Sequence, residues 1–410
     1  MSAANWARWA PAPVGIGLGA FALIDGGEPV WWSAANALNA VTGISIVYGP
    51  ILTGLCAGLS VSTVRSGAVV LVLVLPGRGA ARWLGREILG SCGPALAGFG
   101  VVAAAALAVA GWHGSWPGIA PWGPFLLAAL TIVAACAVGW ALGLVAPSWF
   151  APPLAAVAFY VLPAFDIGGC RTLIEFAGST LTNNALYGLK PTAFWAFCAL
   201  YVAFPLALVL AALFRFGRDG RQAVLAGVAL ALAGAVAYTI IAPGQGEILR
   251  AVSRDGWFCA PVGGSGSTVC LPPEQRRRVG EFAEELSELD ERLLAVAPQS
   301  GGWRYEPRVG FPEEGDGPVI EVGLPEGPEP PLRGDLAELA SWSLVWCGPD
   351  IELAPETEES LRPLRATVML WLDPGTSEQY LSFTGEYPAA APTLDSAREA
   401  LETAKSICGS

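Results

Sequence analysis

The first 242 residues alternate long apolar stretches with short charged or polar loops. A helix needs about 20 mostly apolar residues to cross the roughly 30 Å of bilayer hydrocarbon. By this measure we predict seven membrane-spanning helices, of which the first and the fifth are short. They cover residues 8–24, 36–62, 88–111, 124–146, 150–165, 193–214 and 223–242.

One further apolar stretch lies between Arg65 and Arg78 and is too short to be a span. It holds 12 residues, which would reach only about 18 Å as a helix. Pro76 and Gly77 would also end such a helix. We therefore expect residues 67–75 to lie at the inner face of the membrane. The arginines beside this stretch would then face lipid headgroups, the simpler interpretation, or a cytoplasmic partner.

Basic loop residues gather on one side of the predicted spans and set the expected orientation. The loops on the other side carry most of the acidic residues, and tryptophans cluster there as in an interfacial aromatic belt. The positive-inside rule then places the N-terminus in the cytoplasm and the C-terminal part outside. The chain has 21 arginines but only 2 lysines, with abundant alanine, glycine and proline. This bias suggests a GC-rich bacterial genome, so we expect a multi-pass protein of a bacterial cell membrane. The arginines on the inner side are Arg8, Arg65, Arg78, Arg82, Arg86, Arg215, Arg218 and Arg221.

Charge divides the chain at the same place as hydropathy. Residues 1–242 carry 10 basic and 6 acidic side chains, whereas residues 243–410 carry 13 basic and 29 acidic ones. We therefore predict a helical membrane bundle over 1–242 and a small acidic extracytoplasmic α+β domain over 243–410. In the second part, apolar residues recur at helical spacing from Glu274 to Val296. Further elements are expected as helices at 333–346, 357–372 and 393–408 and a strand at 319–324.

The cysteines fit an outer C-terminal domain, because an oxidising compartment permits disulfides. Cys259, Cys270, Cys347 and Cys408 all lie in this part, and four cysteines allow three pairings. Cys259 and Cys270 flank a short Gly- and Ser-rich loop, so we expect them to pair. Cys347 and Cys408 would then pair by elimination.

Motifs for catalysis or metal binding are missing from the sequence. His113 is the one histidine in the chain, which leaves no zinc site and no Ser-His pair. No phosphate-binding glycine loop with a following lysine occurs, so ATP hydrolysis would belong to another chain. The GGSGS run at 263–267 is interpreted as a flexible loop. We expect no enzyme activity, no cofactor, no metal and no nucleic-acid partner.

Loose motifs recur in a fixed order along the predicted spans and loops. They are Trp31 and Trp32, Tyr48-Gly49-Pro50, the basic segment from Arg65 to Glu87, Gly139, Gly143, Pro147-Ser148 and the run from Pro152 to Ala156. Their order resembles the membrane subunits of type-2 ABC exporters, especially divergent actinobacterial members. This resemblance implies a separate cytoplasmic ATPase subunit, docked near Arg65, Arg78, Arg82 and Arg86, and a second permease subunit of the same or another chain. The chain departs from the six-span pattern of that family by a seventh span and an outer domain.

Two functions from different classes follow. The first is a permease-like subunit that exports a substrate with a separate ATPase and contacts membrane lipid. The second is a membrane-anchored binding or assembly protein that transports nothing and uses its outer domain to meet a ligand or partner. Buried ionisable groups, which ion-coupled carriers need as relays, are absent from the predicted spans, and this argues against a secondary transporter.

Overall fold

The computed structural model describes most of the chain, in the residue ranges given at the end of this paragraph. It is mostly helical with a small sheet region, and it divides into two compact units, Met1–Arg250 and Ala251–Ser410. We call these the helical unit and the C-terminal unit, and each is described by itself. The described residues are 9–25, 33–66, 79–119, 121–164, 187–217, 220–241, 249–251, 254–298, 302–307, 319–322, 333–345, 355–376, 384 and 390–408.

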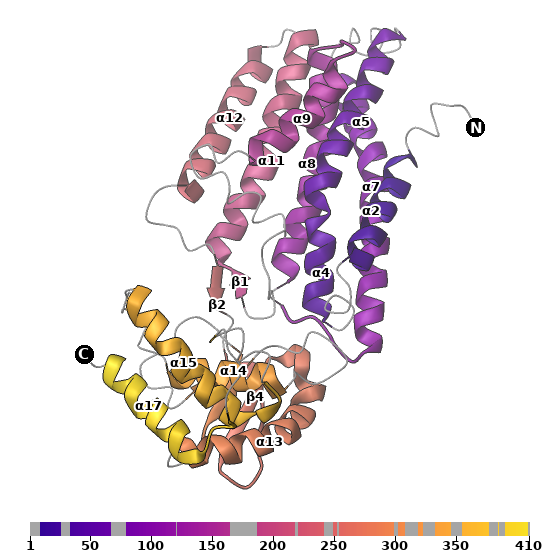
Figure 1. Ribbon diagram of the computed structural model, residues 1–410. Coiled ribbons are helices and arrows are strands. Elements are labelled where there is room, and N and C mark those ends of the chain that lie inside the picture. The colour runs from indigo at the N-terminus through magenta and orange to yellow at the C-terminus, as the bar shows by residue number, and fades with distance from the viewer. Residues whose placement is uncertain are drawn as a thin grey trace. The chain divides into compact units, whose positions relative to one another are not determined.

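The helical unit is a bundle whose helices lie side by side along a common direction (Figure 1). A short two-stranded sheet joins β1 (Tyr187–Leu189) to β2 (Leu249–Ala251). The helices are α2 (Pro11–Asp25), α4 (Ala34–Gly43), α5 (Ser45–Arg65), α7 (Gly79–Trp112), α8 (Trp122–Val145), α9 (Ala151–Ala164), α11 (Pro191–Gly217) and α12 (Gly220–Ile241).

Within the described residues, four helical segments are long and apolar enough to cross a membrane. They are Ala34–Arg65, Arg82–Trp112, Trp122–Val145 and Pro191–Phe214. The helices α2 and α9, with 15 and 14 residues, are apolar but shorter than the roughly 20 residues of a typical span. These two are the segments for which the sequence already predicted short spans.

The spans predicted over 36–62 and 88–111 lie within two of these long segments, Ala34–Arg65 and Arg82–Trp112. In the first segment α4 and α5 meet at Ile44, whose backbone stays in the α-helical region. In the second, the helix extends beyond the predicted span and begins nine residues earlier, at Gly79. Hydropathy placed its start too late because hydrocarbon excludes arginine, whereas alanine, leucine and arginine are all good helix formers.

The interface between α5 and α8 is closely packed through glycines. A Cβ atom at Gly139 would collide with the carbonyl oxygen of Thr53, and one at Gly143 would come within 2.6 Å of the carbonyl oxygen of Ala57. The two glycines are four residues apart and so lie on the same face of α8. This spacing of small residues allows the backbones of two apolar helices to approach closely, as it does in membrane helix pairs.

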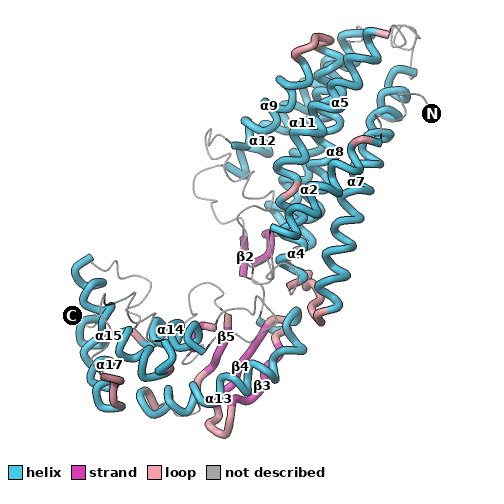
Figure 2. The backbone as a smooth tube through the Cα atoms, turned by 45° about the vertical axis from the view of Figure 1, so that its right-hand side comes forward, coloured by secondary structure: helices cyan, strands magenta, loops and turns pink. Residues whose placement is uncertain are grey.

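The C-terminal unit contains a mixed four-stranded sheet in the order β3-β4-β5-β6 (Figure 2). The pair β3–β4 is antiparallel, and β4–β5 and β5–β6 are parallel. The elements of this unit are β3 (Phe258–Val262), β4 (Ser267–Leu271), η3 (Pro273–Arg278), α13 (Val279–Val296), β5 (Arg304–Glu306), β6 (Val319–Glu321), α14 (Arg333–Leu344), α15 (Pro355–Leu372), η4 (Pro374–Thr376) and α17 (Leu394–Cys408), besides the short turn η2 (Arg254–Gly256).

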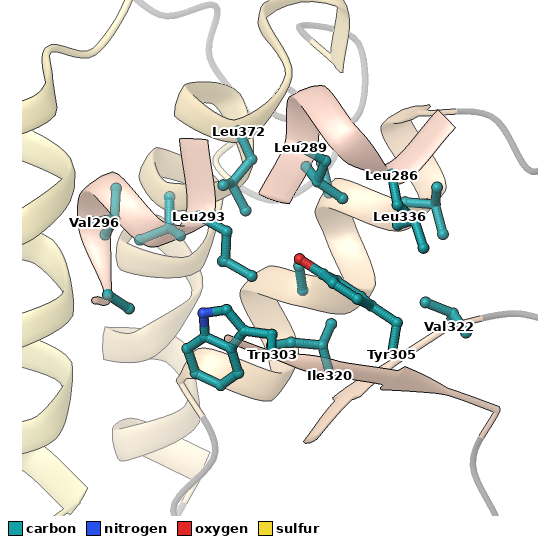
Figure 3. Close-up of a cluster of buried hydrophobic side chains, with 14 of the residues drawn as sticks. Leu286, Leu289, Leu293, Val296, Trp303, Tyr305, Ile320, Val322, Leu336 and Leu372 are labelled. Atoms are coloured by element: carbon teal, nitrogen blue, oxygen red, sulfur yellow. The ribbon is translucent and has the colours of Figure 1, made fainter. Parts of the chain in front are cut away.

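The core of the C-terminal unit forms where α13 packs on the sheet and on the other helices (Figure 3). The six larger apolar residues that recur at helical spacing along α13 are all buried, as the sequence pattern predicted. Each large aliphatic or aromatic side chain buried in this way contributes roughly 1.5–3 kcal/mol. They are Val279, Phe282, Leu286, Leu289, Leu293 and Val296.

The other predicted elements of this unit are confirmed with shifted ends. The strand predicted at 319–324 is β6, and the three later helices are α14, α15 and α17. Thr393 caps α17, since its Oγ1 accepts a hydrogen bond from the Ser396 amide at 3.2 Å. The helix predicted from Glu274 begins as the 3₁₀ segment η3 and becomes α-helical only at Val279. Strands β3, β4 and β5 were not predicted.

Candidate functional site

Two of the four predicted docking arginines lie on the first turns of α7. Arg82 and Arg86 are both exposed and, being four residues apart, share a face of the helix. Between them Leu84 is buried, and Trp83 packs edge-on against Trp140 of α8 with ring centroids 6.0 Å apart. The first turns of α7 are therefore held against the bundle on one side and present two guanidinium groups on the other.

The third arginine, Arg65, ends α5 and lies at the same end of the bundle. Ser60, five residues before it, donates a hydrogen bond of 3.0 Å to the carbonyl oxygen of Trp140. Trp140 thus contacts both the end of α5 and the start of α7. Arg65 itself is exposed and stacks over the ring of Trp149, 4.4 Å from its centroid. The fourth arginine, Arg78, and the segment 67–75 lie outside the described residues.

A polar seam runs through the bundle interior below this end. The indole nitrogen of Trp140 donates to Ser91 Oγ at 3.1 Å. The Cys92 thiol of α7 lies 4.0 Å from the carbonyl oxygen of Val133 on α8, to which it donates a weak hydrogen bond. Cys56, Cys92 and Cys136 are all buried and not disulfide-bonded. No group of three or more His, Cys, Asp or Glu side chains suited to a metal ion occurs in the described part of the chain. The seam therefore joins α7 to α8 by hydrogen bonds.

The helical unit buries hydroxyl groups but no charges, as far as its described residues extend. Thr42, Thr53 and Thr131 each donate to the carbonyl oxygen four residues earlier in their own helix. Tyr48 donates to the carbonyl oxygen of Pro11 at 2.6 Å and so ties α5 to α2. Besides tyrosine, tryptophan and cysteine, the buried polar side chains described in this unit are serines and threonines, so the described bundle contains no buried acid–base pair that could relay protons.

In the C-terminal unit, the disulfide between Cys259 and Cys270 is confirmed. The two residues are directly opposite each other on β3 and β4, with Cα atoms 4.1 Å apart, the close spacing of a non-hydrogen-bonded pair. Cys408 is also disulfide-bonded. Its predicted partner, Cys347, lies outside the described residues, so that pairing stays a prediction.

The GGSGS run, interpreted from sequence as a flexible loop, is a hydrogen-bonded turn between β3 and β4. Ser265 Oγ donates to Asp290 Oδ2 and accepts from the Ser267 amide at 3.2 Å. Asp290, almost fully buried on α13, also accepts from the hydroxyl of Tyr305 on β5 at 2.8 Å. Burial, aided by the Asp290 carboxylate, raises the pKa of Tyr305 well above its ordinary value. This trio connects the turn, α13 and the sheet.

Asp290 was not predicted as a buried polar residue from the sequence. Its spacing could have indicated burial, because Asp290 occupies a position of α13 that faces the core, four residues after Leu286 and three before Leu293. A carboxylate at such a position is rarely buried without partners. Its partners, however, come from separate segments of the chain and depend on the tertiary fold.

A buried carboxylate in this unit pairs with two partly exposed arginines. Glu306 on β5 is 2% exposed, and its carboxylate lies 2.8 Å from a guanidinium nitrogen of Arg254 and 2.9 Å from Nε of Arg304. The two arginines remain partly exposed. This arrangement neutralises a buried carboxylate and offers no nucleophile or proton-transfer pair, so we assign it to the structure of the domain.

Comparison with known proteins identifies no relative. No family model, no curated protein and no solved structure matches this chain. The functional proposal below therefore rests on the geometry of the chain and on the resemblance described from its sequence.

Proposed function

We propose that this chain is a permease-like membrane subunit of an ABC-type transporter that works with a separate ATPase. The single observation that supports this most is the length of α7 together with the two exposed arginines on its first turns. The helix has 34 residues, or about 51 Å at 1.5 Å per residue. It is therefore far longer than the roughly 30 Å of hydrocarbon that a span must cross.

The excess length of α7 lies at its basic end. If the apolar segment from Ile88 to Gly111 fills the membrane, the nine residues before it extend roughly 13 Å further as a helix. Trp83 and Leu84 hold this extension on the bundle. A basic surface fixed in this way suits the docking of an acidic surface on a cytoplasmic ATPase, because electrostatic complementarity selects and orients partners.

The proposed topology has seven spans, with the arginine-bearing ends in the cytoplasm and residues 243–410 outside. It counts the short helices α2 and α9 and the 22-residue helix α12 together with the four long apolar segments. The arginine asymmetry of the loops supports the orientation. The Cys259–Cys270 disulfide supports an oxidising location for the C-terminal unit.

The energy for transport would come from the partner. In the helical unit, the described helices bury no ionisable side chain other than thiols and tyrosine, and ion-coupled carriers use buried charges as relays. An ATPase that binds at the cytoplasmic end would instead supply the free energy of nucleotide hydrolysis. In this proposal the chain also pairs with a second permease subunit, which is either a copy of itself or a related chain.

The test is charge reversal of both exposed arginines, Arg82→Glu with Arg86→Glu, in the full-length protein. We expect a phosphate-loop ATPase to co-purify with the wild-type chain, giving ATP hydrolysis in the preparation. The double variant should lose both the co-purifying ATPase and the ATP hydrolysis. A reporter fused to its C-terminus should show an unchanged orientation. The matched control is Arg362→Glu, which reverses an exposed arginine of the C-terminal unit.

Two results would contradict the proposal. Retention of the ATPase by the double variant would leave Arg82 and Arg86 as determinants of topology alone. Absence of any phosphate-loop ATPase and of ATP hydrolysis from wild-type preparations would favour the membrane-anchored binding or assembly protein.

A further inference from the structure

Arg65 and Trp149 are in contact at the end of the bundle where α5 ends and α9 begins. Trp149 and Phe150 form the turn before α9, and both side chains are 79% exposed. The guanidinium carbon of Arg65 lies 4.4 Å from the centroid of the Trp149 ring. An arginine stacked in this way covers the ring with its face while its N–H groups point outward in the guanidinium plane.

The exposed surface continues from this pair along α9. Phe150, Leu154, Val157 and Tyr160 recur at spacings of three and four residues, and each is at least 50% exposed. This spacing places them on one helix face. In a membrane-spanning bundle such a face contacts acyl chains, so the apolar stripe begins directly at the arginine–tryptophan pair.

A purely structural role accounts for only part of this arrangement. A basic residue in the last turn of a helix interacts favourably with the helix dipole, and either Arg or Lys would do this. That role requires neither an exposed tryptophan nor an adjoining apolar stripe. Within the described residues, moreover, Arg65 makes no salt bridge that would neutralise its charge.

We propose that Arg65 and Trp149 bind the headgroup phosphate of an anionic phospholipid whose acyl chains lie along the exposed face of α9. The guanidinium supplies charge-assisted hydrogen bonds to the phosphate oxygens. Trp149 holds the guanidinium in place at the interface, where tryptophan is favoured. A lipid fits better than a protein partner because the order of the groups matches the order of its parts. The cationic Arg65 would meet the headgroup, the aromatic Trp149 the interface, and the apolar face of α9 the acyl chains.

The experiment is native mass spectrometry of the full-length protein in detergent, titrated with phosphatidylglycerol or phosphatidylcholine of identical acyl chains. We expect the wild type to bind the anionic lipid about tenfold more tightly. Arg65→Gln and Trp149→Ala should each reduce this preference to within about twofold. Arg65→Lys, which keeps the charge at the helix end but loses the planar donor set, should retain about threefold.

Matched controls separate this site from general effects of charge and exposure. Trp112→Ala removes a tryptophan that is 88% exposed at the opposite end of α7, and Arg362→Gln removes an exposed arginine of the C-terminal unit. Both should keep the wild-type preference.

Three outcomes would overturn the inference. The first is an undiminished preference in both Arg65→Gln and Trp149→Ala. The second is displacement of the lipid by millimolar inorganic phosphate, which would assign the site to a free anion. The third is loss of ATPase co-purification in Arg65→Gln with lipid preference intact, which would assign the surface to a protein. None of these bears on Arg82 and Arg86, so the proposed function is tested separately.

Discussion

Removal of the Cys259–Cys270 disulfide, by replacing both cysteines with serine, is expected to destabilise the C-terminal unit by about 3 kcal/mol. The two cysteines are 11 positions apart. Closing a loop of about a dozen residues removes roughly 9–10 cal/mol/K of entropy from the unfolded chain, which is about 3 kcal/mol at 25 °C. Most of the effect thus arises in the unfolded state.

Hydrogen exchange measured by mass spectrometry on the full-length protein can follow this unit separately. The slowest amides of β4 report its cooperative unfolding, because β4 is paired on both sides and its side chains are mostly buried. A loss of about 3 kcal/mol corresponds to exchange faster by about two orders of magnitude. Cys198→Ser, which alters a free thiol of the helical unit, should leave β4 unchanged.

An increase in exchange smaller than about fivefold would refute the loop-closure reasoning. The hydrogen-bonded turn, with Ser265 fixed by Asp290, would then hold the two strands in register without the covalent link.

Two further outcomes are expected. Gly143→Ala should destabilise the helical unit by about 1–3 kcal/mol, because the added methyl group overpacks against Ala57 and Ser60. The loss would appear as a lower unfolding temperature in detergent. The control Gly93→Ala should be neutral or stabilising, since nothing lies within 4 Å of its added Cβ. Because the pKa of Tyr305 is raised in the folded state, the unfolded chain releases this proton first, so stability should fall as pH rises above about 10. Near-UV circular dichroism during heating should show a weaker dependence on alkaline pH in Tyr305→Phe, and an identical dependence in both proteins would contradict this.

Hydropathy and periodicity predicted what depends on local spacing. The stripe from Phe282 to Leu293 specified α13 because a helix repeats its buried face every three to four residues. The strands β3, β4 and β5 were missed because they are only three to five residues long. Their pairing also joins segments distant in sequence: Val269 lies opposite Tyr305 in parallel register.

The candidate site was predicted in part for the same reason. Arg65, Arg82 and Arg86 could be predicted as candidate docking residues, because charged residues beside apolar segments are visible in the sequence. The continuation of α7 through Arg82 and Arg86 was not visible, because hydropathy scores membrane depth and not helix formation. The stacking of Arg65 on Trp149 required α5 and α9 to pack together, which no single segment specifies.

The position of β3 at the edge of its sheet bears on how this protein avoids aggregation. An edge strand leaves a row of backbone groups on which another chain can extend the sheet. In β3 one of the five residues is Pro261, which has no N–H group to donate to an incoming strand. The disulfide also fixes this strand to β4, so it cannot peel away and exchange with another copy. Self-association of the C-terminal unit through this edge is thereby disfavoured.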